Sequence, residues 1–194
     1  MKELIFATHN INKVIEIRSL LPAHLLIKSL ADCGITQGIP EPFDTIAKNA
    51  LEKVRVVSKM VKTNCFSEDT GLEVAALDGS PGVRSARYAG EQASDAENRA
   101  LLLKNMINNN HRDAQFKTVI ALIFNDKEYL FEGICEGALT ENEIGQNGFG
   151  YDSLFVPNGT HKTFAEMELT EKNMYSHRKK AFIKLLAFLN ANHG

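Results

Sequence analysis

Two long apolar stretches, residues 116–124 and 129–139, flank the polar triplet Asn125-Asp126-Lys127. Turn-forming residues between two apolar runs are typical of an antiparallel β-hairpin. The rest of the chain alternates short apolar runs with helical patterns, which favours strands connected by helices. The combination of a hairpin with strand–helix alternation predicts an α/β fold with a mixed, twisted β-sheet flanked by helices.

Periodicity and capping residues locate the remaining elements. Further strands are expected at residues 4–7, 25–30, 65–67, 72–77 and 154–156, and helices at 11–21, 46–61, 95–106 and 170–189. Ser94 and Glu97 have the spacing of a capping box at the start of the third helix. Residues 68–71 predict a tight turn after the 65–67 strand. The 194 residues contain no repeats or linkers, so we expect a single domain spanning 1–194.

Composition narrows the classes of partner. The chain has 22 basic and 24 acidic residues, a net charge of −2, which argues against bulk nucleic-acid binding. Its three cysteines, Cys33, Cys65 and Cys135, lack the spacing of a disulfide framework or a zinc site. No stretch has the length of a signal peptide or a membrane span. We therefore expect a cytoplasmic protein with free thiols that binds neither nucleic acid nor membrane.

Two polar segments follow predicted strands. The first, Thr8-His9-Asn10-Ile11-Asn12-Lys13, opens a helix, where free N–H groups and the helix dipole attract anions that Lys13 can also reach. The alternative is an ordinary helix cap with an exposed lysine. The second, Ser67-Glu68-Asp69-Thr70-Gly71, has two carboxylates beside a glycine, and carboxylates are the ligands that Mg²⁺ prefers. The alternative is a solvated surface turn.

Two further motifs lie in the second half of the chain. Gly148-Phe149-Gly150-Tyr151-Asp152 has an aromatic residue between two glycines, so the backbone can turn sharply and bring the ring to a ligand. Stacking of such a ring on a nucleobase contributes about 1–3 kcal/mol. The alternative is a structural loop anchored by its phenylalanine. Lys172 and Ser176-His177-Arg178 add a basic group, for which the alternative is the solvated face of a helix.

Together these motifs resemble the inosine triphosphate pyrophosphatase family, also called Ham1-like, from Leu4 to about Leu189. The resemblance implies an elongated sheet, two lobes around a central cleft, and a homodimer. It also implies Mg²⁺-dependent hydrolysis of ITP, dITP and XTP to the nucleoside monophosphate and pyrophosphate. Such an activity clears deaminated purines from the nucleotide pool.

The resemblance also implies roles for single residues. Asp69 is the general base and a metal ligand, and Glu41 is the second metal ligand, with Asp44 as its nearest competitor. The substrate-binding residues are Thr8, His9, Asn10, Ile11, Asn12, Lys13, Thr70, Phe149, Gly150, Tyr151, Asp152, Lys172, His177 and Arg178. Lysines 13 and 172 cover the triphosphate, Phe149 stacks on the base, and the His-Arg pair reads its 6-oxo edge. Glu68 departs from the family, which usually has aspartate there.

Two other functions stay open. A Maf-type pyrophosphatase of modified nucleotides has related chemistry, although the Gly-Phe-Gly-Tyr-Asp and Ser-His-Arg motifs argue against it. A nucleotide-binding module without catalysis would keep the pocket, but the presence of Asp69 and Lys13 argues against it. A P-loop NTPase is excluded because the G-x-x-x-x-G-K-[ST] motif is absent.

Overall fold

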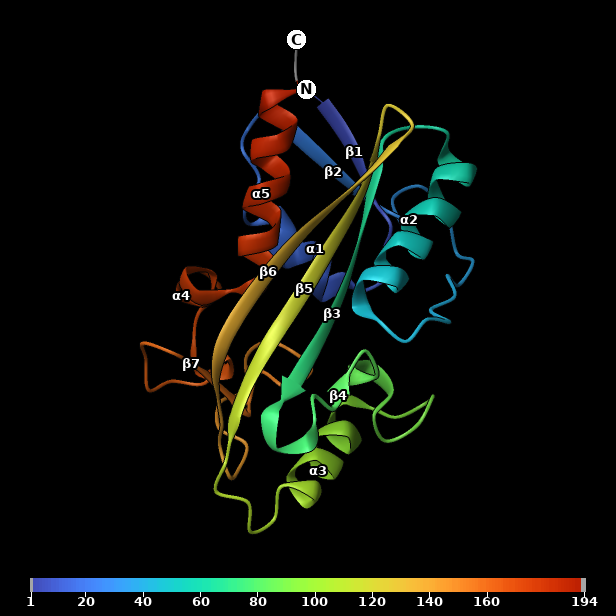
Figure 1. Cartoon of the computed structure of the whole chain (residues 1–194). Coiled ribbons are helices and arrows are strands. Elements are labelled where there is room, and N and C mark those ends of the chain that lie inside the picture. The colour runs from blue at the N-terminus through green and yellow to red at the C-terminus, as the bar shows by residue number, and fades with distance from the viewer. Residues whose placement is uncertain (1, 193–194) are drawn as a thin grey trace. The chain divides into compact units, whose positions relative to one another are not determined.

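The computed structural model describes residues 2–192 and contains a mixed β-sheet with helices, which confirms the predicted α/β class (Figure 1). The strands are β1 (Lys2–Phe6), β2 (Leu25–Ser29), β3 (Cys65–Val74), β4 (Pro81–Gly82), β5 (Asp113–Phe124), β6 (Lys127–Leu139) and β7 (Phe155–Pro157). The helices are α1 (Ile11–Arg18), α2 (Ile46–Val61), α3 (Asp95–Asn105), α4 (Leu169–Tyr175) and α5 (His177–Ala191).

The sheet contains both strand directions. Its order is β2-β1-β3-β5-β6-β7, with β4 paired to β3. β1 is parallel to β2 and β3, whereas the β3–β4 and β6–β7 pairs are antiparallel. The predicted hairpin is β5–β6, joined at Asn125 and Asp126, which have φ of 50° and 61°. Two positive φ values in a two-residue connection match the twist of the strands that it joins.

The chain divides into two compact units, and the boundaries fall within β3, β5 and β6. Unit 1 consists of the chain up to Asp69, of Thr118–Gly133, and of the chain from Arg178 onward. Unit 2 consists of Thr70–Lys117 and Ile134–His177.

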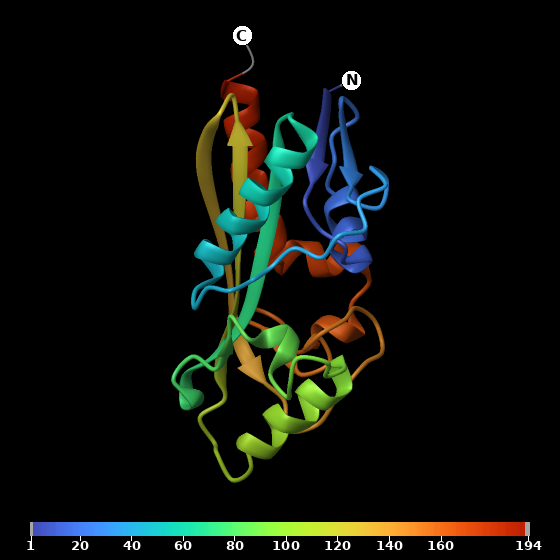
Figure 2. The same ribbon diagram turned by 90° about the vertical axis from the view of Figure 1, so that its right-hand side faces the viewer.

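In unit 1 the sheet lies between two helical layers. The α5 residue Phe182 packs against Phe66 of β3, and Phe66 stacks on Phe6 of β1 with ring centroids 4.4 Å apart. The next β3 residue, Ser67, points the other way and donates a hydrogen bond to the carbonyl of Ala50 in α2. Because strand residues alternate between faces, α2 and α5 cover opposite sides of β3 (Figure 2).

The turn expected at residues 68–71 is wrong, because β3 runs without a break from Cys65 to Val74. Ser67, Glu68 and Asp69 are all buried, since helices cover both faces of the strand here. Polar residues in a buried strand look like a turn when the sequence is read locally, but here side chains of the covering helices meet them. After Val74 the chain forms a short 3-10 helix, Ala75–Leu77, in place of the strand expected there.

Two predicted helices also differ from the structure. α1 ends at Arg18, where the expected helix continued to residue 21. The helix expected at 170–189 is interrupted at Ser176, where ψ of 125° ends α4 before α5 begins. The capping box predicted at Ser94 and Glu97 is confirmed.

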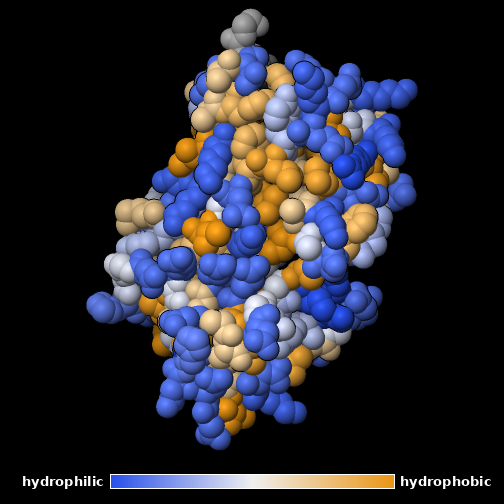
Figure 3. Space-filling model, viewed as in Figure 1, coloured by the Kyte–Doolittle hydropathy of each residue, from blue (hydrophilic) through white to orange (hydrophobic). Residues whose placement is uncertain are grey.

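Unit 2 has a core of its own, rich in aromatic residues. Phe116 of β5, Phe155 of β7 and Phe164 pack with Leu102 of α3 and with Met106, which caps the end of that helix. Hydrophilic side chains cover most of the molecular face seen in Figure 3, with hydrophobic ones showing between them. Within residues 2–192, no helix has the length and hydropathy needed to cross a membrane.

Candidate functional site

The loop between β1 and α1 has the geometry of a helix cap. The side chain of Asn10 accepts a hydrogen bond from the backbone N–H of Lys13 at 3.2 Å, and Thr8 Oγ1 accepts one from the N–H of Asn10 at 3.1 Å. His9 contacts the carbonyl of Gln37 at 2.9 Å through Nε2. His9, Asn10, Ile11 and Asn12 are exposed, and Thr8 is half-buried. The segment thus presents an accessible helix N-terminus in unit 1, which suits an anion.

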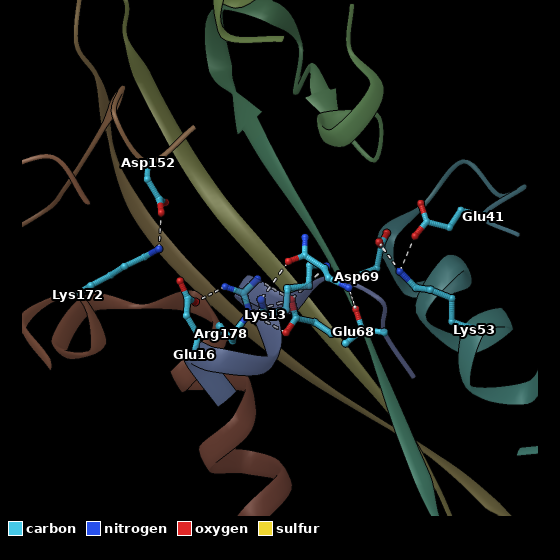
Figure 4. A network of polar contacts seen from close by, with 11 residues as sticks. Lys13, Glu16, Glu41, Lys53, Glu68, Asp69, Asp152, Lys172 and Arg178 are labelled. Atoms are coloured by element: carbon cyan, nitrogen blue, oxygen red, sulfur yellow. Dashed lines mark hydrogen bonds and ion pairs between the residues drawn. The ribbon is translucent and has the colours of Figure 1, made fainter. Parts of the chain in front are cut away.

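Asp69 and Glu41 converge on one lysine (Figure 4). Lys53 Nζ lies 2.8 Å from Asp69 Oδ1 and 2.8 Å from Glu41 Oε1. Lys53 is on the buried face of α2, one turn after Asn49, whose amide exchanges two hydrogen bonds with the backbone of Phe43. That exchange anchors the loop that carries Glu41.

Burial and charge oppose each other in this group. Burial raises the pKa of Asp69, against the lowering effect of Lys53. Burial lowers the pKa of Lys53, but the two carboxylates outweigh it, so the pKa is raised and the ammonium stays charged. Asp44, the competitor of Glu41, is an exposed residue that pairs with Lys48 at 3.0 Å.

On the opposite face of β3, Glu68 belongs to a second ion-pair cluster. Arg178 Nε donates to Glu68 Oε2 at 2.8 Å, and Nη2 donates to Glu68 Oε1 at 2.7 Å. Arg178 Nη1 also donates to Glu16 of α1. Lys13 Nζ lies 3.4 Å from Glu68 Oε1. The Glu68 carboxylate therefore links Lys13 of α1 with Arg178 of α5.

Burial and ion pairing oppose each other at Arg178 and at Lys13, with opposite results. Burial opposes the charge of Arg178, but Glu68 and Glu16 outweigh it and raise its pKa. Burial dominates at Lys13 and lowers its pKa despite Glu68. Across both clusters three cations, Lys13, Lys53 and Arg178, meet four carboxylates. The clusters have no surplus positive charge for a polyphosphate.

The residues present fit a hard divalent cation. Asp69 Oδ2 is buried with no hydrogen-bond partner, although a buried carboxylate oxygen costs free energy unless it is satisfied. The Glu41 carboxylate lies close to that of Asp69, because both contact the Nζ atom of Lys53 at 2.8 Å. Within residues 2–192 no group of three or more His, Cys, Asp or Glu side chains is arranged for a metal ion. Two carboxylates suffice for Mg²⁺, which usually completes its shell with waters and substrate phosphates.

In unit 2, the glycine loop is closed by its own aspartate. Asp152 Oδ2 accepts a hydrogen bond from the N–H of Phe149 at 3.0 Å. Gly148 has φ of +77°, and a Cβ there would lie 2.0 Å from Asp152 Oδ2, so only glycine fits. Phe149 and Gly150 are half-buried. Tyr151 is buried and donates to the carbonyl of Ser85 at 2.8 Å, so it anchors the loop.

Lys172 and His177 lie among aromatic rings. Lys172 Nζ donates to Asp152 Oδ2 at 2.5 Å and lies 5.3 Å from the centre of the Phe149 ring and 5.2 Å from that of Phe164. The His177 ring stacks on Phe116 with centroids 4.7 Å apart and planes 15° apart. The structure thus brings Phe149, Asp152 and Lys172 together in unit 2. The Ser-His-Arg motif is divided, since His177 belongs to unit 2 and Arg178 to unit 1.

Comparison with known proteins shows the family. The model of the Ham1 family matches residues 4–188. The chain belongs to the Ham1 family. It is 49% identical to the dITP/XTP pyrophosphatases of Christiangramia forsetii (97% of this chain, 99% of that protein) and Flavobacterium johnsoniae (97% and 98%). The Ham1 protein structure from Staphylococcus aureus superposes with a TM-score of 0.87 at 34% identity, covering 98% of this chain and 99% of the other.

Sequence reasoning missed several residues of this Ham1 chain. Lys53 holds Asp69 and Glu41, and Glu16 pairs with Arg178. The burial of Lys53 could have been predicted from helical spacing, because position 53 lies on the same face of α2 as the apolar residues Ala50 and Val57. A lysine on the buried face of a helix is expected to have an acidic partner, because an unpaired buried charge costs free energy. Phe116 had no such signal, since its contact with His177 joins residues far apart in the chain.

Proposed function

We propose that this protein is a nucleoside-triphosphate pyrophosphatase that hydrolyses the non-canonical purine nucleotides dITP, XTP and ITP. The products are the nucleoside monophosphate and pyrophosphate. Membership of the Ham1 family and relatives named dITP/XTP pyrophosphatase support this activity. The observation that carries it here is Asp69, a buried carboxylate with one unsatisfied oxygen beside Glu41 and Lys53.

Asp69 acts as the general base in this proposal. Its carboxylate accepts a proton from a water molecule whose oxygen forms a bond to the α-phosphorus. The bond between the α-phosphorus and the bridging oxygen breaks, and pyrophosphate leaves with that oxygen. Burial raises the pKa of Asp69, which makes the carboxylate a better proton acceptor than an exposed aspartate. Lys53 holds Oδ1 in place, so that the unpartnered Oδ2 is the oxygen available for the reaction.

Asp69 and Glu41 would also hold a divalent cation, for which we propose Mg²⁺. When bound it supplies positive charge to the phosphate oxygens and acidifies water. That charge is needed because the three cations of the two ion-pair clusters are already balanced by four carboxylates. Lys13 and the helix N-terminus at Thr8–Asn10 bind the phosphates, because both are half-buried or exposed and carry positive character.

The glycine loop of unit 2 binds the base. The ring of Phe149 stacks on the purine, and Asp152 and Lys172 hold the loop in its closed form. The stacking of His177 on Phe116 fixes its imidazole for contact with the base edge. Recognition of the 6-oxo group by His177 and Arg178, and coverage of the triphosphate by Lys172, stay predictions.

The family match favours this function over a Maf-type enzyme. A homodimer, a cytoplasmic location and a role in clearing deaminated purines are proposed with the activity. Light scattering coupled to size-exclusion chromatography tests the dimer.

Pyrophosphate release from dITP, XTP, ITP, GTP and ATP, measured with and without Mg²⁺, tests the function. We expect release that depends on Mg²⁺ and is faster from the first three nucleotides than from GTP and ATP. Asp69→Asn preserves the shape but removes the charge, so kcat should fall by at least about 10²-fold. Wild-type protein that binds these nucleotides without turnover would establish the non-catalytic alternative, and an Asp69→Asn variant with normal kcat would remove Asp69 from the base role.

A further inference from the structure

Two side chains of helix α3 form hydrogen bonds with the backbone of the glycine loop, residues 148–152 (α3 is lime and the loop orange in Figure 2). The N–H of Gly150 donates to Asp95 Oδ2 at 2.7 Å, and the carbonyl of Gly150 accepts from Arg99 Nη1 at 2.9 Å. Asp95 and Arg99 are four residues apart, so they project from one face of α3. We call this pair the Gly150 clamp. It satisfies both backbone polar groups of the residue that follows Phe149.

The clamp has a second anchor. Arg99 Nε donates to Glu143 Oε2 at 2.8 Å, and the same oxygen accepts from Ser153 Oγ at 3.1 Å. The Arg99 side chain is 18% exposed and that of Glu143 is 42% exposed. The guanidinium therefore ties α3 to Gly150 within the loop and, through Glu143, to Ser153 just after it. A lysine, with its single nitrogen, cannot reproduce that geometry.

Helix α3 is itself firmly held. Its N-terminus has the reciprocal capping box of Ser94 and Glu97. Asn98 is buried and hydrogen-bonds the backbone of Ala89 and Ala86, and Leu102 is fully buried in the core of unit 2. The Gly150 clamp therefore fixes the loop to α3, a helix that is itself well anchored in unit 2.

The loop needs such support because of its glycines. Gly148 and Gly150, with φ of +77° and +59°, flank Phe149 on both sides. Glycine loses more conformational freedom on ordering than any other residue. Asp152 holds the N–H of Phe149, and the clamp holds the next residue, so the backbone on each side of the ring is fixed. If the Phe149 ring is already ordered in the free protein, less conformational entropy is lost when the ligand binds.

We propose that Asp95 and Arg99 are positioning residues that preorganise Phe149 for stacking on a purine. This inference rests on the proposed function, in which Phe149 binds the base. Loss of the clamp should weaken ligands that contain a purine and leave base-free phosphate ligands unaffected.

Isothermal titration calorimetry with inosine monophosphate and with inorganic tripolyphosphate tests the proposal. Arg99→Leu keeps the apolar stem and removes the donors, so Kd for inosine monophosphate should rise about three- to tenfold, as for one or two net hydrogen bonds. Kd for tripolyphosphate should not change. Lys104→Leu, at an exposed position of the same helix, should change neither constant. Arg99→Lys should recover part of the loss.

Asp95→Ala provides an independent variant, since Asp95 is exposed and its truncation opens no cavity. It should show the same selective loss. If either variant binds inosine monophosphate as tightly as wild type, or loses both ligands equally, the clamp does not position Phe149. Wild-type protein that binds no inosine monophosphate overturns this inference, whereas the proposed function is decided separately by the release of pyrophosphate.

Discussion

Arg178 is expected to contribute more to stability than any exposed ion pair of this protein. Its side chain is 2% exposed and donates hydrogen bonds to two carboxylates, Glu68 and Glu16, which are themselves buried. In Arg178→Met the methionine side chain is similar in length to that of arginine, but Glu68 and Glu16 lose their main cation. Breaking a buried pair by removing one partner costs about 3–5 kcal/mol, because the remaining charge stays buried.

A matched control lies on α2. Arg55 also makes a bidentate ion pair, with both carboxylate oxygens of Glu128 at 2.7 Å. The Arg55 side chain is 45% exposed and that of Glu128 is 39% exposed. Exposed pairs contribute about 0–1 kcal/mol, so Arg55→Met should have a small effect. The two variants remove the same number of atoms and the same charge, and differ mainly in burial.

The assay is urea denaturation followed by circular dichroism, since the chain has no tryptophan. Arg178→Met should lower the free energy of unfolding by about 3–5 kcal/mol, and adding Glu68→Gln should restore part of it by removing one uncompensated charge. Added salt should diminish the effect of Arg55→Met and leave that of Arg178→Met almost unchanged. An Arg178→Met variant no less stable than Arg55→Met would refute the reasoning.

Four other outcomes are expected. Lys13→Ala should weaken ITP binding far more than inosine monophosphate binding in calorimetry, since in the proposed function the Lys13 ammonium contacts the polyphosphate; equal weakening would place Lys13 elsewhere. Phe149→Ala should reduce kcat/KM for ITP, XTP and GTP by similar factors because stacking is nearly blind to base identity. If Arg178 reads the 6-oxo group, Arg178→Ala should narrow the preference for ITP over ATP; an unchanged ITP/ATP ratio would remove Arg178 from recognition of the base and leave it the buried ion pairs with Glu68 and Glu16. Burial raises the pKa of the Cys65 thiol to about 12, so iodoacetamide at pH 8 should alkylate the half-buried Cys33 and not Cys65, as mass spectrometry of the native and urea-unfolded protein can show.

Local rules predicted the elements whose signals are local. The capping box at Ser94 depends on residues three positions apart, and the hairpin turn at Asn125-Asp126 depends on two adjacent residues that tolerate positive φ. The α2 helix was predicted with the bounds Ile46–Val61, because a 3.6-residue period repeats over its whole length. The motifs of the candidate site were also visible, because each is contiguous in the sequence.

Only the tertiary structure decided what surrounds those motifs. Residues 68–71 form a buried strand and no turn, because α2 and α5 supply Lys53 and Arg178 to its two faces. Arg178 lies 110 positions from Glu68 in the chain, and no local pattern specifies that contact. The sequence by itself determined the α/β class and the Ham1 resemblance. Which charges are buried, and which cation pairs with which carboxylate, depended on segments that meet only when the sheet assembles, because the free energy of a buried charge is set by its neighbours in space.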